Sequence, residues 1–129
     1  MKIMKFGNLN KILFIFFLFF FISRKLYSDN LIGSSVTIGA LDKITAKFSE
    51  FDILITQKKK FGSLLVEIIK CEKRPPEQIP EDFVLLKIYD EINIDKPILI
   101  FSGWMLSSSR SISPLEHPTY DIWVKDCKI

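Results

Sequence analysis

The chain has 129 residues, a formal net charge of +3 and 48% hydrophobic residues. That length allows one ordinary domain with an appendage, but not two full-sized domains. Two cysteines exclude a disulfide-dense miniprotein and a four-cysteine zinc site, and a single histidine excludes any site built on several histidines. The net charge is smaller than that of a typical nucleic-acid-binding protein, so we expect no nucleic-acid partner.

Basic and aromatic residues concentrate in the first 28 residues of the chain. This segment holds 7 of the 12 phenylalanines, five of the 18 basic residues and none of the 15 acidic residues. The remaining residues, 29–129, therefore keep 13 basic and 15 acidic side chains and carry a net charge of −2. The basic character belongs to the N-terminal segment and not to the domain that follows.

The N-terminal segment has the parts of an export signal. Three lysines form its positive start: Lys2, Lys5 and Lys11. An uninterrupted apolar run then extends from Ile12 to Ile22 and ends before Arg24. Its length fits a signal-peptide core of about 7–15 residues and is short of the ~20 residues that span a bilayer as a helix. We expect residues 1–28 to form a signal helix cleaved after Ser28, which predicts a periplasmic protein. The alternative is an uncleaved anchor that associates with the inner membrane.

Export changes the interpretation of the two cysteines, Cys71 and Cys127. In an oxidising compartment an even pair favours a disulfide over a metal or redox site. Closing the chain between them would stabilise the fold by about 4 kcal/mol in the chain-entropy model. Two alternatives are a pair of buried free thiols and a catalytic cysteine paired with His117.

Apolar runs and period-two alternation predict β-strands in the mature chain. The expected strands cover residues 44–48, 51–55, 63–71, 83–89, 97–104 and 120–127. Residues 29–38 are expected to be a flexible lead-in, and the lysine-rich residues 58–62 a solvated turn. Prolines make residues 73–82 an extended loop, and serines and prolines make residues 107–119 another. About six or seven short strands over residues 39–129 predict a small all-β single domain, either a sandwich or a barrel.

Five runs of the mature chain carry a family resemblance. They are GALDKITAKFSEFDI (39–53), FGSL (61–64), CEKRPP (71–76), FSGWM (101–105) and LEHPTYDIWVKDC (115–127). Together they resemble the family called domain of unknown function 2155, whose members are small exported proteins of Gram-negative bacteria. The resemblance implies a periplasmic setting and supports pairing of Cys71 with Cys127, because both fall on cysteine positions of the pattern. It supplies no activity, because the family has no established biochemical function.

The segment around His117 contains the ingredients of a Ser-His-Asp hydrolase site. Glu116 precedes the histidine, Asp121 follows it, and residues 107–113 are rich in serine. However, the chain has no G-x-S-x-G motif. We therefore favour a structural role, in which the imidazole bonds a backbone carbonyl or a neighbouring carboxylate. The same three side chains are too unspecific a set to predict a metal site, and we expect no metal or cofactor.

Loops on a rigid β scaffold commonly carry recognition, so we expect the proline-rich loop and the loop over residues 107–118 to be the main contact surfaces. The candidate contact residues, on these loops and on the strands beside them, are Arg74, Pro75, Pro76, Trp104, His117, Tyr120 and Trp123. The aromatic members would either pack in the core or form an exposed platform for a glycan or a protein. The sequence thus predicts an exported, non-catalytic interaction module whose partner is another envelope protein. The alternatives are a small periplasmic hydrolase that uses His117 and a glycan-binding domain that uses exposed aromatic residues.

Overall fold

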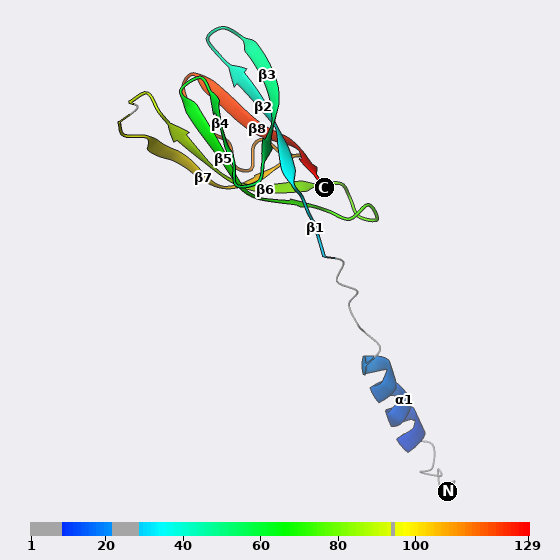
Figure 1. The fold of residues 1–129 in the computed structure, drawn as a ribbon. Helices are drawn as coiled ribbons and strands as arrows, with labels where there is room; N and C mark the ends of the chain where they lie inside the picture. The colour runs from blue at the N-terminus through cyan, green and yellow to red at the C-terminus, as the bar shows by residue number, and fades with distance from the viewer. Residues whose placement is uncertain (1–8, 22–28, 94) are drawn as a thin grey trace, which may run out of the picture.

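A computed structural model describes residues 9–21, 29–93 and 95–129. Within these residues one helix, α1 (Leu9–Phe21), is followed by eight β-strands (Figure 1). The strands are β1 (Leu31–Ile32), β2 (Ser35–Asp42), β3 (Lys47–Leu54), β4 (Lys58–Phe61), β5 (Leu64–Lys73), β6 (Asp82–Asp90), β7 (Ile98–Leu106) and β8 (Tyr120–Lys128). The expected all-β domain is confirmed.

The strands form two antiparallel sheets and, within the described residues, no closed barrel. The first sheet has the order β1-β5-β6-β7, and β4 also pairs with β5. Because β6 pairs with the whole length of β5, β1 and β4 share the other edge of that strand. The second sheet has the order β3-β2-β8.

The core lies between the two sheets and is built mainly from alternate residues of four strands, to which β3 adds Ile53 and β7 adds Met105. Side chains of a strand point alternately to its two faces, so every second residue of each strand faces the opposite sheet. The inner positions are Val36, Ile38 and Ala40 of β2, Leu64, Val66 and Ile68 of β5, Val84, Leu86 and Ile88 of β6, and Ile122 and Val124 of β8. All of them are buried.

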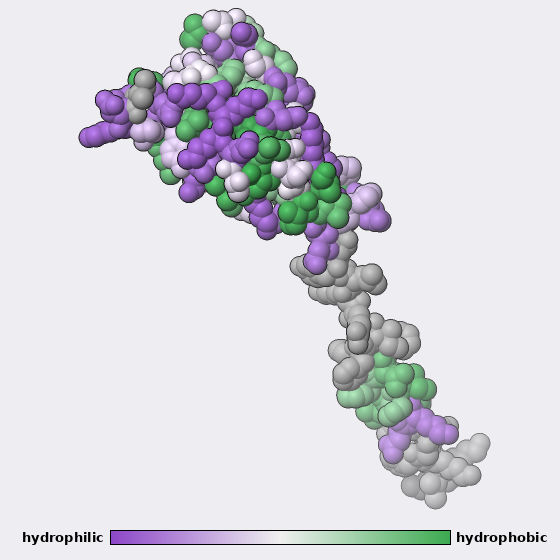
Figure 2. Space-filling view, in the orientation of Figure 1, coloured by the Kyte–Doolittle hydropathy of each residue, from purple (hydrophilic) through white to green (hydrophobic). Residues whose placement is uncertain are grey.

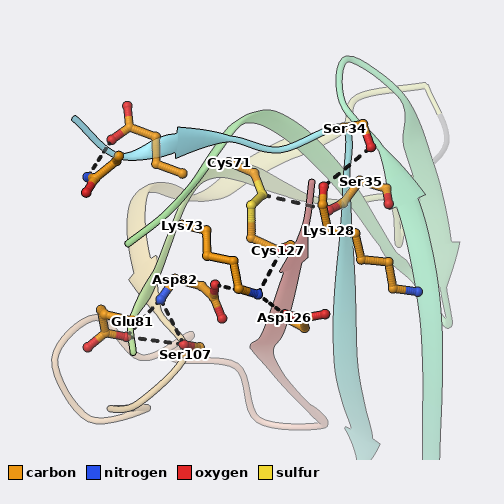
Figure 3. The surroundings of a disulfide bond; sticks show 12 residues. Ser34, Ser35, Cys71, Lys73, Glu81, Asp82, Ser107, Asp126, Cys127 and Lys128 are labelled. Carbon is orange, nitrogen blue, oxygen red and sulfur yellow. Dashed lines mark hydrogen bonds and ion pairs between the residues drawn. A yellow bond between two sulfur atoms is a disulfide. The ribbon is translucent and has the colours of Figure 1, made fainter. Parts of the chain in front are cut away.

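A disulfide joins the two sheets at one end of the core (Figure 3). It links Cys71 of β5 with Cys127 of β8, whose Cα atoms are 6.0 Å apart, as the family resemblance implies. Gly33 passes directly over it, and its N–H donates to the Cys71 carbonyl at 2.9 Å. A Cβ atom at this position would lie 2.6 Å from the Cys71 sulfur and closer still to the Cys127 sulfur. Glycine is therefore the only residue that fits at position 33.

The expected flexible lead-in over residues 29–38 is wrong. Residues 31–32 form β1 on the edge of β5, and β2 begins at Ser35. Val36 and Ile38 are fully buried core residues. β2 is also the central strand of its sheet, paired along both edges, and its residues on the other face, Ser35 and Thr37, are buried as well.

Two local expectations between residues 44 and 62 are also wrong. Residues 43–46 form a turn instead of a strand, because the Asp42 carboxylate accepts the N–H groups of Ile44 and Thr45 and Ala46 takes a left-handed φ of 55°. Conversely, residues 58–61 form β4 instead of a turn. The turn there is confined to the residues that follow, where Gly62 has a φ of 60°.

No helix among the described residues is long and apolar enough to cross a membrane. The expected cleavage point after Ser28 lies outside the described residues, as do Lys2, Lys5 and Arg24. The signal peptide therefore stays a prediction.

The disulfide is expected to be a main contributor to the stability of the domain. Replacing both cysteines with alanine removes a cross-link that closes a chain separation of 56 residues. We expect the free energy of unfolding to fall by about 4 kcal/mol in chemical denaturation. Reduced wild-type protein should behave like the variant, and a loss below about 1 kcal/mol in either would contradict this role.

Candidate functional site

A pocket of about 390 Å³ opens next to the disulfide, between the loop that joins β5 to β6 and the end of β8. We call it the proline pocket. Its apolar wall is made by Leu31, Pro75, Pro76 and Pro80. Its polar wall includes Lys73, Arg74, Glu81, Asp82, Ser107 and Asp126. Both sheets therefore contribute to it, and the proline-rich loop predicted to be a contact surface forms one side.

Lys73 joins the two sheets across the pocket (Figure 3). Its ammonium lies 3.2 Å from an Asp82 carboxylate oxygen of β6 and 2.5 Å from an Asp126 oxygen of β8. It also donates to the Cys127 carbonyl at 3.0 Å. The hydrogen bond to Asp126 raises the pKa of Lys73, although burial opposes it and Asp82 adds to the increase. The ammonium therefore stays charged and holds both carboxylates, while the Asp126 side chain remains 45% exposed.

Glu81 fastens the proline-rich loop to the segment that follows β7. Its carboxylate is buried and accepts hydrogen bonds from the Ser108 N–H at 3.0 Å, from the Ser107 hydroxyl at 3.2 Å and from the Ser108 hydroxyl. Burial alone would raise the pKa of Glu81, but the bonds from Ser108 and Ser107 outweigh it and lower the pKa below its ordinary value. The Ser107 N–H also donates to the Asp82 carbonyl. The wall is thus held in place without a ligand.

Arg74 holds the other end of the proline-rich loop. Its guanidinium lies over the Phe83 ring, 5.3 Å from the ring centroid, and its backbone N–H donates to the Glu81 carbonyl at 3.0 Å. Pro75, the next residue of the loop, is buried, whereas Pro76 is exposed. Figure 2 shows apolar side chains among hydrophilic ones toward the end of the domain where β1 begins. Ile79 of the loop is also exposed, so the loop offers exposed apolar surface on a fixed backbone.

His117 forms a separate, buried network. Its Nδ1 atom accepts the N–H groups of Thr119 at 3.2 Å and Tyr120 at 3.1 Å, and its Nε2 atom lies 3.2 Å from a carboxylate oxygen of Asp90. The imidazole also stacks on the Tyr120 ring. Burial alone would raise the pKa of Asp90, but hydrogen bonds from Ser63 and His117 lower it.

This arrangement leaves neither histidine nitrogen free to accept a proton from a serine hydroxyl. Because Nδ1 accepts two N–H groups, the ring proton lies on Nε2 and is donated to Asp90. The imidazole of His117 bonds a carboxylate, as expected, and two backbone N–H groups instead of a backbone carbonyl. The carboxylate comes from β6 and is neither Glu116 nor Asp121. The geometry therefore gives the hydrolase alternative no support.

The three candidate aromatic residues lie in different environments. Trp123 is only 8% exposed, because its indole lies flat on Gly39, faces Phe48 and is covered by the Arg110 guanidinium, 4.1 Å from the ring centroid. Tyr120 is half-buried. Trp104 of β7 is 40% exposed. The structure thus does not assemble these side chains into one exposed platform.

Within the described residues, no three side chains of the metal-ligating types gather at one point. The polar residues that the pocket does assemble were missed by sequence analysis, namely Lys73, Glu81, Asp82 and Asp126. Each is an ordinary charged residue in sequence, and only long-range strand pairing brings them together. The position of Glu81 directly after Pro80, two residues before the predicted strand over residues 83–89, is the one local signal that a buried carboxylate closes the loop.

The fold and the disulfide define a small, disulfide-linked, all-β domain. Residues 36–127 match the family described as "Uncharacterized protein conserved in bacteria (DUF2155)". The chain therefore belongs to the domain of unknown function 2155 family, as its sequence runs indicated. It is 42% identical over 89 residues to "Uncharacterized protein RP359" of Rickettsia prowazekii (strain Madrid E). The match covers 68% of this chain and 57% of that relative, so the chain spans little more than half of the relative's length. No solved structure matches the chain.

The Glu81 network predicts a dependence of stability on acid pH. Because the pKa of Glu81 in the folded protein lies below its ordinary value of 4.5, the ionised carboxylate stabilises the fold at neutral pH. That contribution is lost as the pH falls through the folded-state pKa. In Glu81→Gln we expect a free energy of unfolding lower by about 1–2 kcal/mol at neutral pH and a shallower loss between about pH 6 and pH 3. Parallel pH slopes for both proteins would contradict the network.

The His117 network predicts a structural effect of substitution. We expect His117→Ala to lower the free energy of unfolding by about 2 kcal/mol, because it removes one hydrogen-bond donor from the Asp90 carboxylate and leaves two buried N–H groups without their acceptor. Glu116→Ala, at the exposed neighbouring position, is the matched control and should change stability by less than about 0.5 kcal/mol. A stable His117→Ala protein that has lost an ester-hydrolysing activity of the wild type would overturn the structural role.

Proposed function

We propose that the chain is an exported, non-catalytic envelope protein that binds a segment of a partner polypeptide in the proline pocket. The observation that carries the proposal is the preorganised pocket. Lys73 and Glu81 fix its polar wall through bonds that span both sheets and two loops, while Pro76 and Pro80 remain exposed. A site that is already ordered binds at a lower entropic cost than a mobile loop does.

The lining indicates what kind of segment fits. The apolar wall suits one apolar side chain of the partner. On the opposite side, the Asp126 carboxylate is 45% exposed and can accept a hydrogen bond from an N–H group or a cation. A polypeptide segment supplies both features together.

Export is supported by two independent features. The N-terminal segment has a basic start followed by an apolar run, as signal peptides have. Disulfides persist in oxidising compartments such as the periplasm and are rare in the cytosol. A buried disulfide that joins the two sheets is in keeping with a periplasmic location.

Site-directed photocrosslinking in the producing bacterium tests the proposal. A photoreactive residue at Gln78, which lines the pocket, should give one crosslinked product of defined mass. The same residue at the exposed Ile44 of the β2–β3 turn should give none. Pro76→Asp places a charge on the apolar wall and should abolish the product, whereas the matched Pro97→Asp should preserve it. Equal crosslinking from Gln78 and Ile44, or a product insensitive to Pro76→Asp, would contradict the proposal.

A further inference from the structure

β7 presents an unpaired sheet edge. It is the terminal strand of the first sheet, and no strand of the described residues pairs with its far side. In Figure 1 it lies at the outer margin of the domain. In an antiparallel pair, alternate residues direct their N–H and C=O groups away from the neighbouring strand. Half of the backbone groups of β7 are therefore available to another chain.

The sequence of β7 lacks the features that normally protect such an edge. Natural edge strands carry charged residues or prolines, or are very short. None of the nine residues ILIFSGWML is charged or proline. The other edge strands among the described residues differ: β4 has three lysines, β1 has only two residues, and β3 and β8 each carry several charged side chains. β7 is therefore the strand that is best suited to pair with another chain.

A β-bulge limits the usable part of this edge. The register with β6 shifts between Ile88 and Tyr89, so Ile100 is the extra residue of β7. From Phe101 to Leu106 the pairing is regular, opposite Phe83 to Ile88. Gly103 lies within the regular pairing, opposite Leu86. The regular edge therefore consists of six residues, Phe101–Leu106.

Side chains on the outer face of the same segment can support an added strand. Trp104 is 40% exposed and sits opposite Leu85, and Ser102 is exposed opposite Lys87. Met105 points to the other face and is buried. A strand added to this edge would place one of its side chains beside the Trp104 indole, and cross-strand aromatic pairs stabilise sheets.

We propose that the Phe101–Leu106 edge of β7 takes an extended, uncharged segment of a partner polypeptide as an additional strand. The inference rests on the proposed function, since it names the conformation in which the partner is bound. An edge without a single charge offers nothing to neutralise a charged strand, so it selects an uncharged one. Main-chain hydrogen bonds then supply the affinity.

The position of the edge next to the pocket favours a larger partner over a second copy of this chain. Ser107 follows Leu106 directly and lines the proline pocket, so the edge and the pocket are continuous. Six residues are about a quarter of the roughly 20–30 residues per side of a standard interface. Together with the 11 residues that line the pocket, they approach that size. A pairing of two copies through β7 alone would not.

Amide hydrogen exchange with a synthetic peptide tests the inference. The probe is an uncharged six-residue peptide of alternating threonine and valine. At saturating peptide we expect exchange of the outward N–H groups of residues 101–106 to slow by at least about fivefold. A peptide of the same sequence with alternate N-methylated amides should have no effect. No slowing, or equal slowing by both peptides, would overturn the inference.

A charged substitution on the edge strand, compared with the same substitution in a nearby loop, tests the inference in a second way. Ser102→Lys should abolish the slowing, and Ser111→Lys, the same change at an exposed serine of the following loop, should preserve it. Slowing that persists in Ser102→Lys would overturn the inference. If Ser102→Lys fails to fold, the two peptides still decide the question on wild-type protein. Exchange at the edge that slows without peptide as the protein concentration rises would show that a second copy of the chain pairs with the edge. That result would overturn the inference that a partner polypeptide does so.

The two proposals fail in distinguishable ways. If wild-type protein shows no peptide effect but retains the Gln78 crosslink, only the inference about β7 is wrong. If the Gln78 crosslink is absent while the peptide protects the edge, the pocket is not the binding site and the edge still takes a strand.

Discussion

The disulfide between Cys71 and Cys127 is the constraint on which the rest of the molecule depends. It fixes the separation of β5 and β8, which belong to different sheets. Lys73 lies two residues after the first cysteine and Asp126 one residue before the second, so their ion pair forms at a distance that the cross-link sets. The disulfide therefore helps to position the polar wall of the proline pocket.

Two polar networks among the described residues have different consequences. The His117 network is closed, because each ring nitrogen has a partner and the side chain is buried. The network of Lys73, Glu81 and Asp126 is open, because it borders a cavity and leaves Asp126 partly exposed to solvent. A closed network stabilises a loop, whereas an open one next to apolar surface can recognise a partner. The proline pocket is therefore a better candidate for a binding site than the surroundings of His117.

Sequence patterns predicted the second half of the domain well. β5 to β8 were recognised from alternating or continuous apolar residues, and the proline-rich and serine-rich loops were placed correctly. β2 was missed because small polar residues such as Ser35 and Thr37 resemble a linker. Farther along the same strand, the absence of a side chain at Gly39 leaves room for the Trp123 indole. β4 was missed because three lysines usually mark a turn. Here Lys58 and Lys60 are neutralised by Glu67 and Glu91, which local sequence does not reveal.

The candidate site was predicted only in part. The Arg74-Pro75-Pro76 segment was identified because prolines fix an extended backbone, and it lines the pocket. Its charged partners were not, because the pairs between Lys73 and Asp126 and between Glu81 and Ser108 join residues distant in sequence. The sequence left open whether Trp123 is buried or exposed, because the Arg110 side chain that covers it belongs to a loop whose path follows no periodic pattern.

The most direct test of this account is the redox state of the two cysteines in the cell. Protein produced with its own N-terminal segment is unfolded in acid, treated with a mass-tagged thiol reagent without reductant, and weighed intact. We predict no added tag, and two tags only after reduction. The same chain without residues 1–28, kept in the cytoplasm, is the control and should take up two tags directly. Two tags on the full chain without reductant would mean that the cross-link is absent in the cell, and would contradict the account of both the pocket and export.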